Sequence, residues 1–180
     1  MFILILVIVF ILCKDIDILK NKGRKITDLP IFPFVRIFAA NFRTMNAYKH
    51  EVRYYECDRM GVTHHSNYVR FMEEARVDWL DQLGFGFDKI EAENVFSPVI
   101  SISCEYKHPT TFKDIIEIDV KICNMSAMKF EFEYTMRVEG KVVCIGHSSH
   151  CFIENNRPVA ISKRLPDLYK ILTERLSDQT

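Results

Sequence analysis

The sequence predicts an α+β domain in which a five-stranded antiparallel sheet wraps the apolar face of one long helix. Two observations lead to this fold class: a helical repeat of apolar residues between positions 66 and 84, and period-two alternation in three later segments. One predicted strand precedes the helix and four follow it. The domain extends over residues 45–180 and contains no internal repeat or low-complexity tract.

The long helix is predicted from its two ends and from the residues between them. Ser66 is a residue type that caps helix N-termini, and Gly84 is one that ends helices. Charged side chains mark one side of the helix, and apolar side chains recur at spacings of three and four on the other. The apolar positions are Tyr68, Phe71, Met72, Ala75, Trp79 and Leu83, and the charged ones are Arg70, Glu73, Asp78 and Asp81.

Three segments after the helix alternate strictly between apolar and polar residues. This alternation predicts antiparallel strands with one buried face and one face in solvent. The apolar residues are Ile100, Ile102, Cys104 and Tyr106 in the first segment, Ile116, Ile118, Val120 and Ile122 in the second, and Phe130, Phe132, Tyr134, Met136 and Val138 in the third.

The remaining elements are predicted from shorter signals. Residues 50–55 are expected to form the first strand, and residues 141–153 a longer last strand. A turn at residues 139–140 leads into the last strand, residues 155–158 end it, and Pro166 begins a short terminal helix.

The first 44 residues differ in character from the rest of the chain. An apolar run covers residues 2–13, and a basic segment follows it. The run is shorter than the ~20 residues that a transmembrane helix needs, and its charges follow it, unlike those of a signal peptide. A short membrane anchor is one interpretation. The interpretation we favour is an extension outside the working protein, with Met45 as the physiological start, and it predicts a cytoplasmic protein.

Charge and cysteine content exclude two classes of protein. Residues 1–44 hold seven Lys and Arg against three Asp and Glu, which leaves 17 against 21, a net charge of −4, for residues 45–180. A mildly acidic domain without a basic stripe is a poor candidate for binding nucleic acid. The six cysteines show no CxxC motif and lie partly in strand-like runs, so free thiols in a reducing cytosol are expected.

The loop before the helix holds the residues with the clearest chemical potential. Asp58, Gly61 and the pair His64-His65 come shortly before the helix N-terminus. Backbone N–H groups at a helix N-terminus are unpaired and positive, so they can hold a developing oxyanion. A carboxylate base and an oxyanion binder on one short loop suggest acyl transfer.

The residues of this loop and of the helix that follows it resemble a known signature. Tyr54, Asp58, Gly61, His65, Asn67 and Tyr68, followed by the run at residues 71–76, resemble the 4-hydroxybenzoyl-CoA thioesterase-like hotdog proteins, and within them the YbgC-type acyl-CoA thioesterases. The resemblance extends from residue 47 to the terminal helix. It implies a hotdog fold and hydrolysis of an acyl-CoA thioester to the free acid and CoA.

The resemblance also implies roles for individual residues. Asp58 matches the catalytic aspartate, which acts as a base towards water or as a nucleophile. The backbone N–H of His65 matches an oxyanion donor, and Tyr54 matches a tyrosine implicated beside the aspartate. The expected substrate-binding residues are Gly61, Ser66 and Asn67. A homodimer or homotetramer is implied, and no metal or cofactor is expected.

Other interpretations of these residues stay open. Asp58 could only shape a turn, His65 could only orient the loop, and Tyr54 could be a core residue of the first strand. Glu73 on the helix is the alternative base. A hydrolase of acyl groups on acyl carrier protein and a non-catalytic acyl-CoA-binding module are the rival functions.

Two further sets of residues bear on ligands. His64 and His65 lack the i, i+4 spacing of helical metal ligands, and His147 and His150 would point to opposite faces of a strand. The basic residues nearest to an expected CoA site are Lys107, Lys113 and Lys129, and the sequence does not select among them.

Overall fold

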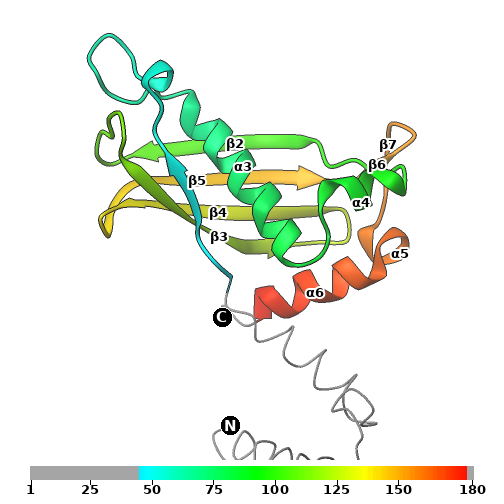
Figure 1. Ribbon diagram of the computed structural model, residues 1–180. Coiled ribbons are helices and arrows are strands. Elements are labelled where there is room, and N and C mark those ends of the chain that lie inside the picture. Colours follow the sequence, from blue (N-terminus) through cyan, green and yellow to red (C-terminus); the bar gives the residue numbers. More distant parts are fainter. Residues whose placement is uncertain (1–44, 178–180) are drawn as a thin grey trace, which may run out of the picture. The chain divides into compact units, whose positions relative to one another are not determined.

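A curved antiparallel sheet and one long helix form the domain, and the computed structural model describes residues 45–177. The strand order is β1-β3-β4-β5-β2, and α3 lies across one face of the sheet (Figure 1). The strands are β1 (Tyr48–Glu51), β2 (Val99–Tyr106), β3 (Ile115–Met125), β4 (Lys129–Val138) and β5 (Lys141–Cys151). The other elements are η2 (Tyr54–Glu56), α3 (Asn67–Gln82), α4 (Phe87–Ala92), β6 (Ile153–Glu154), β7 (Arg157–Pro158), α5 (Ile161–Arg164) and α6 (Pro166–Ser177).

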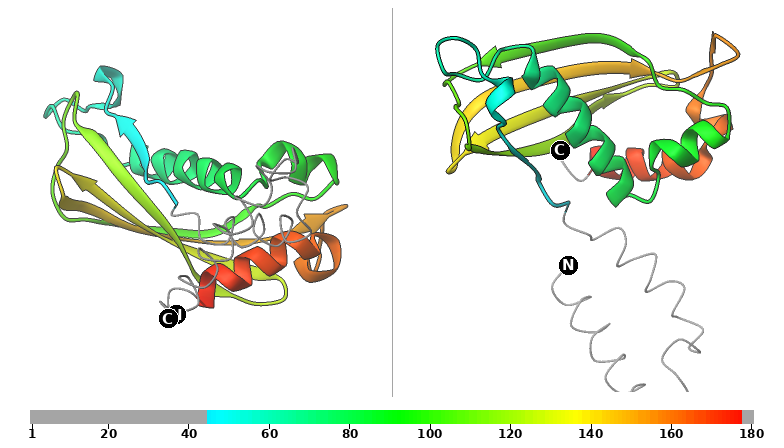
Figure 2. Two further views of the ribbon diagram at one scale, coloured as in Figure 1. Left: turned by 60° about the horizontal axis from the view of Figure 1, so that its bottom comes forward. Right: turned by 45° about the horizontal axis from the view of Figure 1, so that its top comes forward.

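The core lies between α3 and the inner face of the sheet, which curves around the helix (Figure 2). The predicted apolar face of α3 is confirmed, except that Leu83 is only partly buried. The alternation in β3 and β4 is confirmed as well, except that Val120 and Val138 are only partly buried. Fully enclosed side chains of the core include Phe71, Met72, Ile116, Ile118, Ile122, Phe132, Tyr134 and Met136.

Two of the predicted breaks in the chain have the geometry of two-residue hairpin turns. Glu139 and Gly140 both have positive φ, and so do Asn155 and Asn156. Two successive residues with positive φ form a type I′ turn, whose twist matches that of the flanking strands. Gly84, at φ +83°, lies just after α3 as expected for a helix-ending residue.

The short strand β1 and the terminal helix α6 lie at the β3 edge of the sheet. β1 pairs only with the beginning of β3, from Tyr48 opposite Ile118 to Glu51 opposite Ile115. α6 contacts β3 as well, and its Leu168 and Leu172 are buried. Within residues 45–177, no helix is both long and apolar enough to cross a bilayer.

At Gly146 a side chain of α3 packs directly against the backbone of the sheet. Gly146 lies in β5 opposite Met72, and a Cβ at this position would come within 2.7 Å of the Met72 Sδ atom. A larger residue here would push α3 away from the sheet. The position of α3 therefore depends on the absence of a side chain at this residue.

The prediction for the first strand was wrong in its extent. The strand ends at Glu51, and residues 54–56 form the 3₁₀ helix η2. The reason is local: the Glu56 carboxylate accepts a hydrogen bond from the backbone N–H of Arg53 at 2.7 Å, which holds the chain in a turn. Tyr54 is consequently 79% exposed, so its interpretation as a core residue was wrong too.

The prediction of a buried face for the segment that became β2 was also wrong. Ile100, Ile102 and Tyr106 are 41–50% exposed, and only Cys104 on this face is partly buried. The cause is position, because β2 is the outer strand beside β5 and pairs on one side only within residues 45–177. The predictions for the apolar run and the basic segment of residues 1–44 lie outside the described residues.

Candidate active site

Asp58 lies in a tight turn that the chain closes on itself. Its backbone N–H donates to the Val62 carbonyl at 2.8 Å, and its carbonyl accepts from the Gly61 N–H at 3.0 Å. One carboxylate oxygen, Oδ1, accepts a hydrogen bond from the Met60 N–H at 2.7 Å. Gly61 adopts φ +79°, a conformation that costs a glycine little.

The turn leaves half of the Asp58 carboxylate available for chemistry. Asp58 is partly buried, and none of the described residues donates a hydrogen bond to its second oxygen, Oδ2. The hydrogen bond to Oδ1 is that of an Asx turn, so the turn-forming role is present. The same hydrogen bond fixes the direction of the carboxylate, as positioning of a base or nucleophile requires.

This turn is attached to the loop between β2 and β3. The Thr111 hydroxyl donates to the Gly61 carbonyl at 2.8 Å, and the Thr63 N–H donates to the Thr110 carbonyl at 2.8 Å. Inside, the Thr110 hydroxyl lies 2.6 Å from that of Thr63 and 2.9 Å from that of Tyr68. The loop that carries Asp58 is thus held on two sides by buried or backbone hydrogen bonds.

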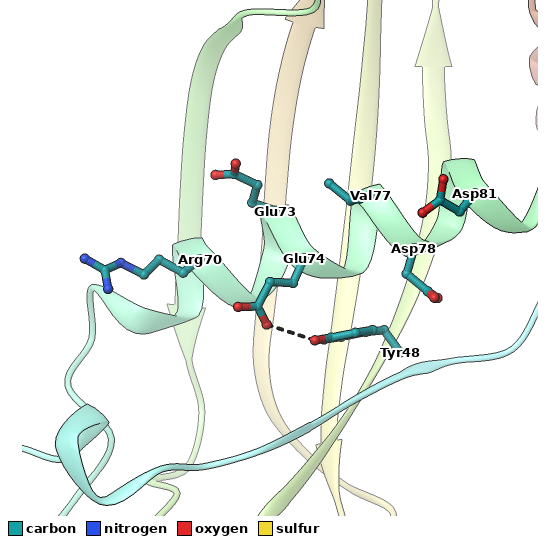
Figure 3. Close-up of a pocket in the computed structure, with 7 residues that line it drawn as sticks. All are labelled: Tyr48, Arg70, Glu73, Glu74, Val77, Asp78 and Asp81. Carbon is teal, nitrogen blue, oxygen red and sulfur yellow. Dashed lines mark hydrogen bonds between the residues drawn. The ribbon is translucent and has the colours of Figure 1, made fainter. Parts of the chain in front are cut away.

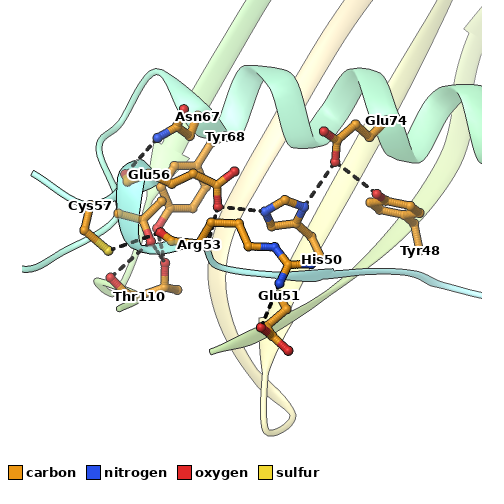
Figure 4. A network of polar contacts seen from close by, with 11 residues as sticks. Tyr48, His50, Glu51, Arg53, Glu56, Cys57, Asn67, Tyr68, Glu74 and Thr110 are labelled. Atoms are coloured by element: carbon orange, nitrogen blue, oxygen red, sulfur yellow. Dashed lines mark hydrogen bonds and ion pairs between the residues drawn. The ribbon is translucent and has the colours of Figure 1, made fainter. Parts of the chain in front are cut away.

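The start of α3 is tied to η2 through Asn67. The Asn67 side-chain amide donates to the Glu56 carbonyl at 2.8 Å (Figure 4). The His64 N–H donates to the same carbonyl at 2.8 Å. Ser66 occupies the predicted N-cap position, but its side chain makes no capping hydrogen bond. Its hydroxyl lies 2.8 Å from Nδ1 of His64. Asn67 thus joins the two segments that flank Asp58.

His65 lies at the exposed end of this arrangement. Its ring packs on that of His64 at a centroid distance of 4.1 Å, and its carbonyl accepts a hydrogen bond from Tyr106 at 3.0 Å. Burial and the neighbouring Cys104 raise the pKa of Tyr106 to about 12, so this hydroxyl stays protonated and donates. Among the described residues, none accepts a hydrogen bond from the His65 backbone N–H.

Tyr54 comes from η2, close in sequence to Asp58, but its ring takes part in a different contact. It meets Phe112 edge to face at a centroid distance of 5.7 Å. No hydrogen bond between the Tyr54 hydroxyl and Asp58 is present in the part of the chain that the structure describes. Of the expected site residues, Gly61 contacts Asp58 directly through the backbone. Ser66 contacts His64, and Asn67 contacts the Glu56 carbonyl through its side chain.

Glu73 is an exposed residue of α3, on the charged side of the helix. It lines a hollow of about 510 Å³ whose floor is the charged side of the helix (Figure 3). The hollow is lined by Tyr48, Arg70, Glu73, Glu74, Val77, Asp78 and Asp81. No residue of the Asp58 turn lines it, so the two candidate bases lie in different places.

A polar network that the sequence reasoning missed lies between β1, η2 and α3 (Figure 4). His50 Nε2 is 2.9 Å from Glu56, and its Nδ1 is 3.1 Å from Glu74, which also accepts from Tyr48 at 3.0 Å. A neutral imidazole donates from one nitrogen only. For both ring nitrogens of His50 to make hydrogen bonds with carboxylates, His50, Glu56 and Glu74 together must therefore carry one proton more than a neutral imidazole and two ionised carboxylates. Burial, and then the hydrogen bond to Glu74, raise the pKa of Tyr48 to about 12.

A second polar cluster lies in the core, where periodicity predicted only apolar contacts. Ser148 joins the Tyr134 hydroxyl at 2.9 Å to Nε2 of His150 at 2.7 Å. Arg76, only 5% exposed, lies near Tyr134, where its charge acts to lower the pKa of the phenol, and its Nη1 has no hydrogen-bond partner among the described residues. Burial, and then Arg76, lower the pKa of His150 to about 3. His147 is exposed and His150 buried, so the prediction of opposite faces is confirmed.

Comparison with known proteins identifies the family. A family model described as the thioesterase-like superfamily matches residues 52–171. YneP of Bacillus subtilis strain 168, whose assignment as an acyl-CoA thioesterase is provisional, is 32% identical over 120 residues, 65% of this chain and 87% of that protein. The acyl-CoA thioester hydrolase YbgC of Escherichia coli O157:H7 is 33% identical over 81 residues, 45% of this chain and 60% of YbgC.

A solved structure agrees with the family assignment. The crystal structure of a hypothetical protein from Aquifex aeolicus superimposes with a TM-score of 0.66 at 32% identity, covering 69% of this chain and 97% of that one. The predicted hotdog fold and the predicted kinship with YbgC-type proteins are thereby confirmed. The chain belongs to the thioesterase-like superfamily, and by that membership it is a hotdog-fold thioester hydrolase.

Proposed function

We propose that this protein hydrolyses an acyl-CoA thioester to the free acid and CoA, with Asp58 as the catalytic carboxylate. The observation that carries the proposal is the Asp58 turn. One carboxylate oxygen is held by the Met60 N–H, while the other has no donor among the described residues. The names of YneP and YbgC support acyl-CoA as the substrate class.

The proposed chemistry needs only groups of the chain and water. Asp58 removes a proton from water as the water oxygen attacks the thioester carbonyl carbon. The carbonyl oxygen becomes an oxyanion, which accepts a hydrogen bond from the backbone N–H of His65. When the carbonyl re-forms, the C–S bond breaks, and the CoA sulfur leaves as a thiolate that takes the proton from Asp58, which restores the carboxylate.

In the other route that Asp58 allows, its carboxylate attacks the carbonyl carbon directly. The C–S bond breaks, CoA leaves, and a mixed anhydride joins the acyl group to Asp58. Water then hydrolyses the anhydride and restores the carboxylate. Neither route uses a metal or a cofactor, and the assignment of Tyr54 to the chemistry remains a prediction.

The test of this function compares the full-length protein with its Asp58→Asn variant. CoA release is followed from short, long and aromatic acyl-CoA substrates, with the thiol signal of the protein subtracted. We expect hydrolysis by the parent and a loss of about 10²-fold or more in kcat for the variant. Glu73→Gln is the matched control, because it removes the carboxylate of the other candidate base.

Each other outcome has a defined meaning. Equal turnover by the parent and Asp58→Asn, with loss in Glu73→Gln, would transfer the catalytic role to Glu73. Tight binding of acyl-CoA without turnover of any substrate would identify a binding module. Turnover of thioesters on acyl carrier protein alone would identify the carrier-protein hydrolase.

The exposed edge strand β2 supports a homodimer in which two sheets join edge to edge, with a tetramer as the larger assembly. Val99, Ile100, Ile102 and Tyr106 leave 41–51% of their surface exposed on this edge. An apolar strand with unpaired backbone groups favours pairing with a second copy.

We expect light scattering to give twice or four times the chain mass, and Ile102→Lys to lower it. Met128→Lys, at an exposed apolar site on the β3–β4 turn, is the control; a parent of single-chain mass would contradict the dimer.

The proposed location is the cytoplasm. Five cysteines of the described residues carry free thiols, as a reducing compartment allows. Mass spectrometry of the native protein tests the proposed start at Met45, because peptides from before Arg43 would contradict it.

A further inference from the structure

Two aromatic rings and a lysine form an exposed surface beside the Asp58 turn. Tyr54 and Phe112 are 79% and 43% exposed and meet edge to face. The Lys113 ammonium lies 5.5 Å from the centre of the Phe112 ring. We call these three residues, Tyr54, Phe112 and Lys113, the aromatic platform. An exposed surface with flat apolar rings and a cation has the features of a binding surface.

The platform is connected directly to the turn that holds Asp58. Phe112 follows Thr111, whose hydroxyl donates to the Gly61 carbonyl at 2.8 Å, and Thr111 forms a bridge with Val62. Tyr54 precedes Asp58 by four residues in η2. The platform and Asp58 are therefore held by the same pair of loops, so one acyl-CoA molecule can contact both, with its pantetheine arm between them.

The backbone under the platform is held in a single shape. Lys113 adopts φ +72°, a region that non-glycine residues seldom occupy. Its N–H donates to the Val52 carbonyl at 2.9 Å, and the Val52 N–H donates to the Asp114 carbonyl at 2.9 Å. The Asp114 carboxylate accepts a hydrogen bond from the Thr111 N–H at 2.7 Å, so this neighbouring acid is bonded to the backbone of the loop. The cost of this unusual φ is offset by these hydrogen bonds, so the backbone at Lys113 is held in one conformation.

Lys113 differs in ion pairing and position from Lys107 and Lys129, the other two lysines that the sequence suggested for a CoA site. Lys107 pairs with Glu105 at 2.5 Å, and Lys129 lies at the opposite end of β3, beside the turn at Ser126. No acidic residue within residues 45–177 forms an ion pair with Lys113. Of the three, only Lys113 combines a free charge with a place beside the Asp58 turn.

The chemistry of the platform matches one part of the proposed substrate. CoA ends in an adenosine that carries phosphates, and a purine stacks on aromatic side chains whatever its neighbours. A lysine ammonium binds phosphate as a point charge. The acyl-pantetheine part of the molecule offers neither an aromatic ring system nor the phosphates of the nucleotide.

We propose that the aromatic platform binds the nucleotide end of CoA, with the adenine in the corner between the perpendicular rings of Phe112 and Tyr54, stacked on one and against the edge of the other, and a phosphate at Lys113. This inference rests on the proposed function and goes beyond it. It predicts a hydrolase that prefers CoA thioesters to thioesters of bare pantetheine or of acyl carrier protein, because these lack the adenosine. Tyr54 then contributes through its ring and not through its hydroxyl.

The test compares two substrates with the same acyl group, an acyl-CoA and the corresponding acyl-pantetheine. In the full-length protein, Phe112→Ala and Lys113→Ala are each expected to raise KM for acyl-CoA roughly tenfold with kcat unchanged. KM for acyl-pantetheine is expected to stay the same. Met128→Ala and Lys121→Ala, an exposed apolar and an exposed basic residue elsewhere on the sheet, are the controls and leave both substrates unaffected.

Tyr54 offers a matched pair of variants. Tyr54→Phe keeps the ring and removes the hydroxyl, so KM for acyl-CoA is expected to stay that of the parent, whereas Tyr54→Leu is expected to raise KM for acyl-CoA alone. A loss of kcat in Tyr54→Phe on both substrates would assign the hydroxyl to the chemistry and overturn the stacking role. Circular dichroism shows whether each variant is folded, and Phe112→Leu replaces Phe112→Ala if the latter is not.

A binding measurement separates this inference from the proposed function. Adenosine 3′,5′-bisphosphate is titrated into the parent, Phe112→Ala and Lys113→Ala by calorimetry, without any turnover. Binding that weakens about tenfold in both variants supports the platform even if no thioester is hydrolysed. Equal binding by all three proteins overturns the inference. So does a change of oligomeric state in Phe112→Ala, which would make the platform an interface between copies of the chain.

Discussion

Replacing Gly146 by alanine tests how closely α3 is seated on the sheet. The new Cβ would come within 2.7 Å of the Met72 Sδ atom and 2.9 Å of its Cε atom, closer than real Cβ atoms approach. Met72 is 1% exposed, and its sulfur accepts a hydrogen bond from Cys104, so its side chain has little room to move. The contact therefore has to be relieved by a shift of the side chain or of the helix.

The size of the effect follows from two opposing contributions. Overpacking a close-packed core typically costs about 1–3 kcal/mol. The backbone of Gly146 does not have positive φ, so alanine fits it and returns about 0.4–1 kcal/mol by restricting the unfolded chain. We expect Gly146→Ala to lower the free energy of unfolding by about 1–2 kcal/mol, measured by urea denaturation with an unchanged m value.

A double-mutant cycle identifies the contact responsible. Met72→Ala alone should cost about 2–5 kcal/mol through the cavity that it leaves. The methyl group that Gly146→Ala introduces partly fills that cavity, so the double variant should be more stable than the sum of the single effects by about 0.5 kcal/mol or more. Additive effects, or a Gly146→Ala protein as stable as the parent, would refute the close seating of α3 on β5.

The remaining predictions concern charge and turn geometry. Burial lowers the pKa of His150 to about 3, whereas in the unfolded chain its pKa is about 6.5, so between these pH values the unfolded chain binds the proton more readily. The free energy of unfolding that depends on His150 is therefore complete above pH 6.5 and falls by about 1.4 kcal/mol per pH unit between pH 6.5 and pH 3. Urea denaturation across this pH range should show that the free energy of unfolding depends less steeply on pH in His150→Leu than in the parent. The same pH dependence in both proteins would contradict the prediction. Arg76→Met should raise the pKa of His150, followed by its NMR titration, and leave stability equal or higher, because the guanidinium is buried with Nη1 unpartnered within residues 45–177. A large loss of stability would contradict this prediction, because it would mean that the contacts of Arg76 with Tyr134 and Phe87 outweigh the cost of its burial. Gly61→Ala should cost about 1 kcal/mol in thermal unfolding through its positive φ alone, since no atom crowds a Cβ there.

Local signals in the sequence were sufficient for much of the fold. The apolar spacing of α3, the alternation of β3 and β4, and the turn at residues 139–140 depend on neighbours within a few positions. Such patterns can be recognised without knowing how the rest of the chain folds. The position of Ser66 at the start of α3 was predictable for the same reason, although its hydroxyl pairs with His64 and does not cap the helix.

The residues that were misjudged depend on partners far away in the chain. Arg76 falls at a helix position that periodicity leaves ambiguous, and its burial depends on β4 and β5. His50 looks like an ordinary strand residue until α3 brings Glu74 to its side. For β2, alternation predicted a buried face, but a strand at the edge of the sheet has no described neighbour to cover it.

The sequence by itself determined the fold class, the family signature and the identity of the loop that carries Asp58, because each is written in residues close together in the chain. Only the tertiary structure decided what surrounds that loop. It attached Gly61 to Thr111, left the His65 N–H without an acceptor among the described residues, and turned the Tyr54 ring to Phe112. These contacts join segments about 50 residues apart, and their geometry depends on how the strands pack, which no local pattern encodes.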